Sequence, residues 1–203
     1  YQFNNTEHAA NLFGLKEFGN IYSRLGNPTV GALEARLTAL EEGAMCVALS
    51  SGTSAVMYSL INIMSQGDNF VTANQLYGGT YTMFDNILPE YGINSKKVDI
   101  TDLDAVKGAI DDKTRAIYCE TITNPGLVVA DIAALADIAH SKGIPLIVDA
   151  TFTTSAILKP FEYGADIVVY SLTKWMSGHG RVIAGAVIEK GGFDWGNGNF
   201  PLY

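Results

Sequence analysis

Short apolar segments alternate with capped helical segments along most of this chain, and this alternation constrains the fold more than any other feature. Seven segments have the length and apolar content of buried strands: 45–49, 69–73, 93–98, 115–120, 144–149, 166–170 and 182–188. Alternation of this kind predicts right-handed crossovers between parallel strands. We therefore predict an α/β fold with a mostly parallel seven-stranded sheet and helices on both faces.

Helix-start signals divide the chain into an arm and a domain. Asn27-Pro28 is typical of a helix start, because Asn caps well and Pro tolerates the first helical position. Thr101 is the expected cap of a later helix, with Asp104 in the capping-box position. Residues 1–27 show no clear period. We interpret 1–27 as an N-terminal arm and 28–203 as one large domain.

Composition excludes several classes of protein. The net charge is −8, which argues against a nucleic-acid groove lined by Lys and Arg. No apolar run approaches the roughly 20 residues of a membrane span, and the N-terminus lacks the pattern of a secretion signal. Only 17% of residues are charged, so we expect part of the surface to be buried against another chain.

The cysteines and histidines predict neither a disulfide nor a metal site. Cys46 and Cys119 lie in predicted strands, so we expect buried thiols in a reducing cytoplasm. His8, His140 and His179 are too scattered for a metal site.

Ligands of such sheets bind where the strands end, so the residues after each strand are the candidates for function. Ser51-Gly52-Thr53 opens a helix, whose N–H groups either bind an anion or are merely capped. No Gly-x-x-x-x-Gly-Lys-Ser/Thr or Gly-x-Gly-x-x-Gly motif is present, which argues against a P-loop or a nicotinamide nucleotide site. Asp149 ends an apolar strand and is either a helix cap or the partner of a buried cation.

Lys174 follows a strand and has apolar neighbours in the sequence. It is either a nucleophilic amine or a surface lysine. Ser171 and Thr173 could donate to an anion, and Tyr77 could stack on a flat ring or pack in the core. Together these groups meet the needs of pyridoxal phosphate (PLP): a lysine, an acid for the pyridine nitrogen, phosphate donors and an aromatic cover. Spacing alone does not identify the cofactor.

The chain resembles the Cys/Met-metabolism family of PLP enzymes, which includes cystathionine synthases and lyases, methionine γ-lyases and O-acetylhomoserine sulfhydrylases. The motifs that carry the resemblance occur through nearly all of the chain in the family's order: Tyr22-Ser23-Arg24-Leu25-Gly26-Asn27-Pro28-Thr29, Ser50-Ser51-Gly52-Thr53, Leu76-Tyr77-Gly78-Gly79-Thr80, Glu120-Thr121 with Asn124-Pro125, Val148-Asp149, and Ser171-Leu172-Thr173-Lys174 with Ser177-Gly178-His179-Gly180. The form Ser-Leu-Thr-Lys-Trp and the segment 191–195 are most similar to the O-acetylhomoserine sulfhydrylases.

The resemblance implies a role for each matching residue. Lys174 would form the Schiff base with PLP and then move protons, and Asp149 would pair with the pyridine nitrogen. Tyr77 would stack on the ring and assist the leaving group. The remaining implied cofactor-binding residues are Gly52, Thr53, Ser171 and Thr173 at the phosphate, Asn124 near the ring hydroxyl, and Tyr22 and Arg24 at the phosphate of a neighbouring subunit.

These roles imply a homo-oligomer, at least a dimer and by analogy a dimer of dimers. The implied reaction is PLP-dependent γ-replacement, in which O-acetyl-L-homoserine and sulfide or a thiol give homocysteine and acetate in methionine biosynthesis. A methionine γ-lyase, a cystathionine γ-synthase or a cystathionine γ-lyase is the alternative. A non-catalytic α/β binding module is the alternative from another class.

This sequence differs from the family in three ways. Ala150 replaces the usual Asn after Asp149, and Arg181 follows His179-Gly180 where other residues are common. Family members are about twice as long, and their C-terminal small domain supplies an arginine for the substrate carboxylate. We therefore expect that this chain is the cofactor-binding part of an enzyme, with the small domain missing.

Overall fold

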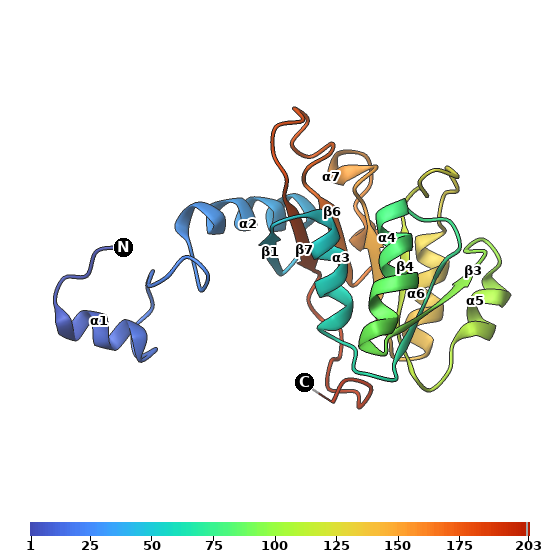
Figure 1. Ribbon diagram of the computed structural model, residues 1–203, viewed down its shortest axis with the longest axis horizontal. Helices are drawn as coiled ribbons and strands as arrows, with labels where there is room; N and C mark the ends of the chain where they lie inside the picture. The colour runs from blue at the N-terminus through green and yellow to red at the C-terminus, as the bar shows by residue number, and fades with distance from the viewer. Residues whose placement is uncertain (202) are drawn as a thin grey trace.

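Seven strands form one sheet in the order β1-β7-β6-β5-β4-β2-β3 in the computed structural model, which describes residues 1–201 and 203 (Figure 1). The strands are β1 (Met45–Leu49), β2 (Asn69–Ala73), β3 (Asn94–Val98), β4 (Thr114–Glu120), β5 (Leu146–Asp149), β6 (Ile167–Ser171) and β7 (Gly185–Glu189). Strands β3, β2, β4, β5 and β6 are parallel, whereas β7 is antiparallel to both β6 and β1. The predicted seven-stranded, mostly parallel sheet is therefore confirmed.

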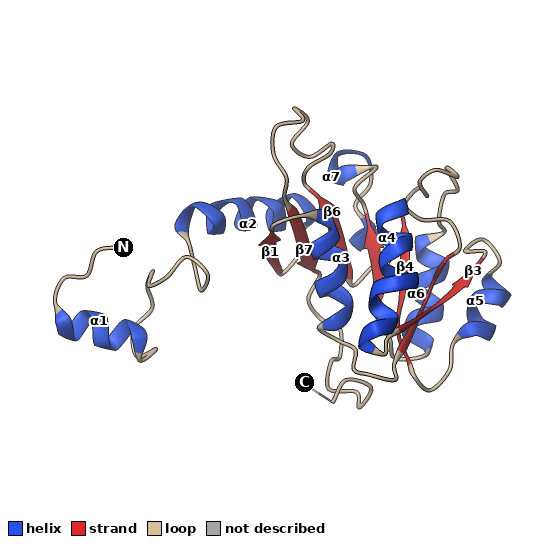
Figure 2. Cartoon of the chain, in the orientation of Figure 1, coloured by secondary structure: helices blue, strands red, loops and turns tan. Residues whose placement is uncertain are grey.

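Helices cover both faces of the sheet, with α3 and α4 on one side and α6 on the other (Figure 2). The helices are α1 (Thr6–Phe13), α2 (Pro28–Glu41), α3 (Gly52–Ile61), α4 (Gly78–Thr82), α5 (Leu103–Ala109), α6 (Ile132–Ser141) and α7 (Thr154–Ile157). The described residues also include helical segments that are wound differently from an α-helix. These are the π-helix η1 (Met83–Ile87) and the 3₁₀-helices η2 (Leu88–Tyr91) and η3 (Pro160–Tyr163).

Two local predictions differ from the structure. The cap of α5 is Asp102, which accepts from the N–H of Asp104 at 3.1 Å, and not Thr101. The Thr101 hydroxyl instead donates to Asp99 at 2.7 Å, because that carboxylate already closes the preceding turn. The strand expected at 182–188 begins only at Gly185, and the residues before it form an exposed loop.

The N-terminal arm contains a helix that the sequence pattern did not predict. Asn5 caps α1 by accepting from the His8 N–H at 2.8 Å. The helix lies well away from the sheet, whereas α2 packs on β1 (Figure 1). Asn27 caps α2 as predicted, with Pro28 as its first residue. Leu15 and Phe18, which follow the C-terminal end of α1, are exposed. The division at residue 27 stays a prediction.

The core lies between the central strands and the helices. All five residues of β2 are buried. Phe84 contacts Phe70 and Tyr118 edge to face, with ring centroids 4.7 and 5.2 Å apart respectively. Cys46 and Cys119 are buried and unpaired, and burial raises the pKa of each thiol to about 12. None of the helices in the described residues has the length and hydropathy of a membrane span.

Candidate PLP site

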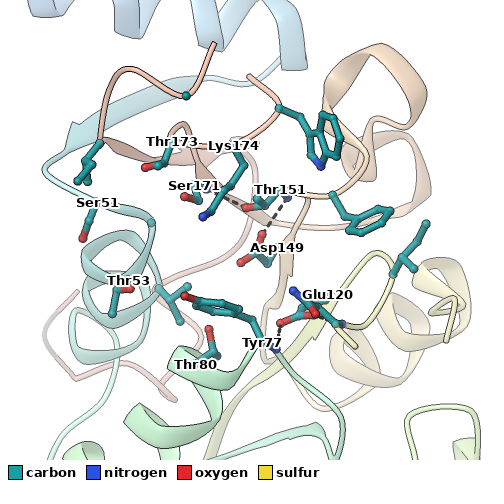
Figure 3. Close-up of a pocket in the computed structure, with 18 of the residues that line it drawn as sticks. Ser51, Thr53, Tyr77, Thr80, Glu120, Asp149, Thr151, Ser171, Thr173 and Lys174 are labelled. Carbon is teal, nitrogen blue, oxygen red and sulfur yellow. Dashed lines mark hydrogen bonds between the residues drawn. The ribbon is translucent and has the colours of Figure 1, made fainter. Parts of the chain in front are cut away.

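A pocket of about 620 Å³ opens at the carboxyl ends of β4, β5 and β6, where they meet the N-terminus of α3 (Figure 3). Parallel sheets bind ligands at this edge, as the sequence analysis assumed. The lining residues are Ser51, Gly52, Thr53, Val56, Tyr77, Thr80, Glu120, Ile122, Asn124, Asp149, Thr151, Phe152, Ser171, Thr173, Lys174, Trp175, Gly178, Gly180 and Ile183.

The first turn of α3 forms one end of the pocket. Ser51 caps the helix by accepting from the Ser54 N–H at 3.0 Å. Gly52 is buried, and a Cβ at this position would lie only 2.8 Å from Ser171 Cα. Gly185 of β7 likewise leaves room, since a Cβ there would lie 2.9 Å from Gly52 N. These two glycines let the positive end of a helix dipole lie against β6 and β7, which makes an anion site.

Asp149 ends β5 near the middle of the pocket. Its Oδ1 accepts from the Thr151 N–H at 2.9 Å, and its Oδ2 accepts from the Tyr118 hydroxyl at 3.3 Å. Burial raises the pKa of Asp149, and these two hydrogen bonds oppose that rise. The helix-cap alternative is wrong, because α7 starts at Thr154 and its cap position is Thr153. The half-buried Asp149 carboxylate can pair with a cation, which is the other alternative for this residue.

Lys174 lies in the turn after β6. Figure 3 shows its amine directed into the pocket, beside Ser171 and opposite Tyr77. The Ser171 N–H donates to Thr151 Oγ1 at 2.8 Å, which fixes the end of the strand. Thr173 Oγ1 donates to the Ala184 carbonyl at 3.2 Å and accepts from its N–H at 3.1 Å. Thr173 must therefore exchange one backbone contact to donate to an anion.

Tyr77 and Asn124 approach the pocket from two other loops. The side chain of Tyr77 is about half exposed. Both loops are held through Glu120, which accepts from the Tyr77 N–H at 2.7 Å and from the Asn124 N–H at 2.9 Å. Burial chiefly, and also the nearby charge of Asp149, raises the pKa of Glu120 to about 7, against the opposing effect of the two N–H groups.

The structure brings most of the predicted site residues together. Eight of them line the pocket: Gly52, Thr53, Tyr77, Asn124, Asp149, Ser171, Thr173 and Lys174. Tyr22 and Arg24 lie outside this pocket, on the exposed arm, with the Arg24 guanidinium 5.1 Å from the Tyr22 ring centroid.

The sequence analysis assigned no role to several lining residues. Glu120 and Thr151 stand at or just after strand ends, so their position was the available signal. Phe152 and Trp175 add apolar surface to the pocket; Trp175 belongs to the Ser-Leu-Thr-Lys-Trp motif, whereas no motif contains Phe152. Among the described residues, no group of His, Cys, Asp and Glu is placed to hold a metal ion.

The donor set fits PLP. The amine of Lys174 can hold the aldehyde, and Asp149 can pair with a protonated ring nitrogen. The Ser54 N–H already donates to Ser51, so a phosphate dianion would bind to the N–H groups of Gly52 and Thr53 at the start of α3. A flat ring between these groups would lie against Tyr77. Fold and site together define a PLP enzyme built on a doubly wound sheet.

Comparison with known proteins gives the family. The sequence profile of the Cys/Met metabolism PLP-dependent enzymes matches residues 1–201, and the chain belongs to this family. Since the family consists of enzymes, the binding-module alternative is set aside. The chain is 48% identical over 203 residues to the O-acetyl-L-homoserine sulfhydrylase of Leptospira meyeri, covering all of this chain and 46% of that relative. It therefore spans about half the length of the curated relatives it matches.

Two solved structures are similar in fold. A Campylobacter jejuni protein whose structure contains N'-pyridoxyl-lysine-5'-monophosphate has a TM-score of 0.90 and 43% identity, over 95% of this chain and 48% of that one. The cystathionine γ-lyase of Lactobacillus plantarum, complexed with L-serine, has a TM-score of 0.82 and 41% identity, over 86% of this chain and 46% of that one.

Proposed function

We propose that this chain is the cofactor-binding part of an O-acetylhomoserine sulfhydrylase, which converts O-acetyl-L-homoserine and sulfide to homocysteine and acetate in methionine biosynthesis. The observation that carries the proposal is one pocket holding Lys174, Asp149 and the N-terminus of α3. The 48% identity to the Leptospira meyeri enzyme supports this substrate class.

Each pocket residue has a binding task in this proposal. Lys174 Nζ holds the cofactor covalently, and the Asp149 carboxylate accepts a hydrogen bond from the ring nitrogen. The N–H groups of Gly52 and Thr53 bind the phosphate, helped by the hydroxyls of Ser171 and Thr173. Asn124 contacts the ring hydroxyl, and Tyr77 covers one face of the ring.

PLP, when bound, supplies an electron sink for negative charge at the substrate's α-carbon. The residues of this chain then move protons. Lys174 Nζ, once displaced by the substrate amine, takes the α-proton and relays a proton at the β-carbon. Tyr77 assists the departure of acetate from the γ-carbon. The C–O bond breaks as acetate leaves, HS⁻ then forms a C–S bond to the γ-carbon, and the protons taken from the β- and α-carbons return to them.

A second copy of the chain completes the site in this proposal. Tyr22 and Arg24 would contact the phosphate in a neighbouring subunit, and a dimer of dimers is the proposed assembly. The exposed arm, which lies away from its own sheet, supports this arrangement (Figure 1). We also place the protein in the cytoplasm, which its two unpaired cysteines favour.

Product analysis of the full-length protein tests the reaction. Homocysteine and acetate from O-acetylhomoserine plus sulfide are the expected products. The similarity to cystathionine γ-lyase makes a lyase the second candidate, and 2-oxobutyrate from methionine or cystathionine would favour it. A wild-type protein that shows no visible absorption band after saturation with PLP and removal of the unbound cofactor would contradict both candidates.

A further inference from the structure

Glu120 connects two loops of the pocket that are far apart in the sequence. It is the last residue of β4, and its side chain is buried. One carboxylate oxygen accepts from the backbone N–H of Tyr77 at 2.7 Å, and the other accepts from that of Asn124 at 2.9 Å. Each N–H thus donates to a carboxylate oxygen rather than to a carbonyl oxygen of the sheet or of a helix.

The strand register places this carboxylate beside the proposed partner of the ring nitrogen. Glu120 of β4 pairs with Asp149 of β5 in the parallel ladder. Asp149 in turn is fixed by the Thr151 N–H and the Tyr118 hydroxyl. The positions of Tyr77 and Asn124 are therefore set relative to Asp149 by neighbouring residues of two adjacent strands.

We propose that Glu120 is a positioning residue, which holds Tyr77 over one face of the cofactor ring and Asn124 at its edge, both in register with Asp149. This inference rests on the proposed PLP site. Glu120 acts through the backbone of the two loops, so its role differs from those of the residues that would contact the ring.

Neither neutral substitution can reproduce this pair of contacts. Above pH 7, where Glu120 is ionised, its carboxylate offers an acceptor to each N–H group, and hydrogen bonds to a charged group are the stronger kind. In Glu120→Gln, the amide oxygen can accept from one N–H only, and the amide NH₂ group then faces the other donor. In Glu120→Ala both contacts are lost.

Asp166 provides a matched control at the amino end of β6, the end of the strand that lies away from the pocket. Its carboxylate is similarly buried and accepts from the backbone N–H of Leu146 at 2.8 Å and from the His140 ring at 2.9 Å. Asp166→Asn therefore removes a comparable buried charge without touching the pocket loops.

Hydrogen–deuterium exchange of the full-length protein without PLP is the first measurement. We expect Glu120→Ala to speed exchange of the Tyr77 and Asn124 amides about tenfold to a hundredfold, and Glu120→Gln to do so in one of the two loops. Asp166→Asn should leave both loops as in the wild type. Unchanged exchange in both loops of Glu120→Ala would overturn the proposal.

PLP titration, followed by the visible circular dichroism of the bound cofactor, is the second measurement. We expect both Glu120 variants to bind PLP about tenfold more weakly and with an altered spectrum, whereas Asp166→Asn keeps the wild-type values. Wild-type affinity and spectrum in Glu120→Ala would refute the positioning role. Failure of the wild type itself to bind PLP would refute the proposed function, while the exchange data would still decide whether Glu120 holds the loops.

Discussion

Replacing Gly52 with alanine tests whether the close approach of α3 to β6 creates the phosphate site. An added Cβ would lie 2.8 Å from Ser171 Cα, whereas ordinary contacts begin near 3.4 Å. Helix and strand must therefore separate by more than the roughly 0.6 Å that this distance alone requires, because Ser171 Cβ lies nearer still and is not a flexible side-chain end.

Both stability and cofactor affinity should fall. Overpacking of this kind costs about 1–3 kcal/mol in the free energy of unfolding. The N–H groups at the start of α3 move with the helix, and a hydrogen bond to a charged phosphate is worth about 1.5–3 kcal/mol. We therefore expect PLP to bind about tenfold to a hundredfold more weakly.

Chemical denaturation without PLP and titration with PLP measure the two effects separately. Gly108→Ala in α5 is the control, because a Cβ there meets no atom within 4 Å and the site is remote from the pocket. It should keep wild-type affinity and stability, or gain slightly in stability. Wild-type affinity in Gly52→Ala would refute the argument that this glycine admits the phosphate.

Three further predictions concern covalent attachment, the second subunit and pH. Lys174→Ala should be colourless after dialysis, and a pyridoxyl group found elsewhere by mass spectrometry of the borohydride-reduced wild type would contradict the assignment. Arg24→Ala should retain PLP about tenfold less well than the wild type. The control Arg36→Ala, which also removes an exposed arginine, should retain PLP as the wild type does. Equal retention in the wild type and Arg24→Ala would count against a site shared between subunits. The pKa of Glu120 is about 7 in the folded protein against an ordinary 4.5, so the folded state binds the extra proton. The free energy of unfolding therefore includes a contribution from this proton that is fully present below pH 4.5. This contribution is lost as pH rises through 7, a fall of about 3 kcal/mol. Denaturation of the PLP-free protein from pH 4 to 8 should show a fall that is larger in the wild type than in Glu120→Gln by this amount, because Asp149, whose pKa burial also raises, remains in both; equal slopes would disprove it.

The fold was predictable because the strands are apolar and the helix starts are marked. The bounds of β1 and β2 match the predicted segments, and Asn27 caps its helix. The antiparallel direction of β7 was not predictable, since pairing with β1 and β6 depends on contacts distant in sequence. The helix α1 was missed because its eight residues make only about two turns, too few for a period to be recognised in the sequence.

The site was predictable where a residue follows a strand and carries a reactive group, as Asp149 and Lys174 do. The role of Glu120 was not predictable, because its partners are backbone N–H groups. A sequence motif identifies side chains, but it does not show which of them accept hydrogen bonds from distant backbone N–H groups. The hydroxyl of Thr151, in the turn after β5, is a second example, because it accepts from the backbone N–H of Ser171.

The position of β7 has a consequence for protein synthesis. Strand β1 pairs with β7 alone, and Met45 meets Glu189 across that ladder. A nascent chain that stops before Gly185 thus leaves β1 as an unpaired edge, while the beginning of α3 already lies against Ser171 of β6. The end of the pocket where Gly185 lies against Gly52 can therefore form only after β7 has left the ribosome and paired with β1.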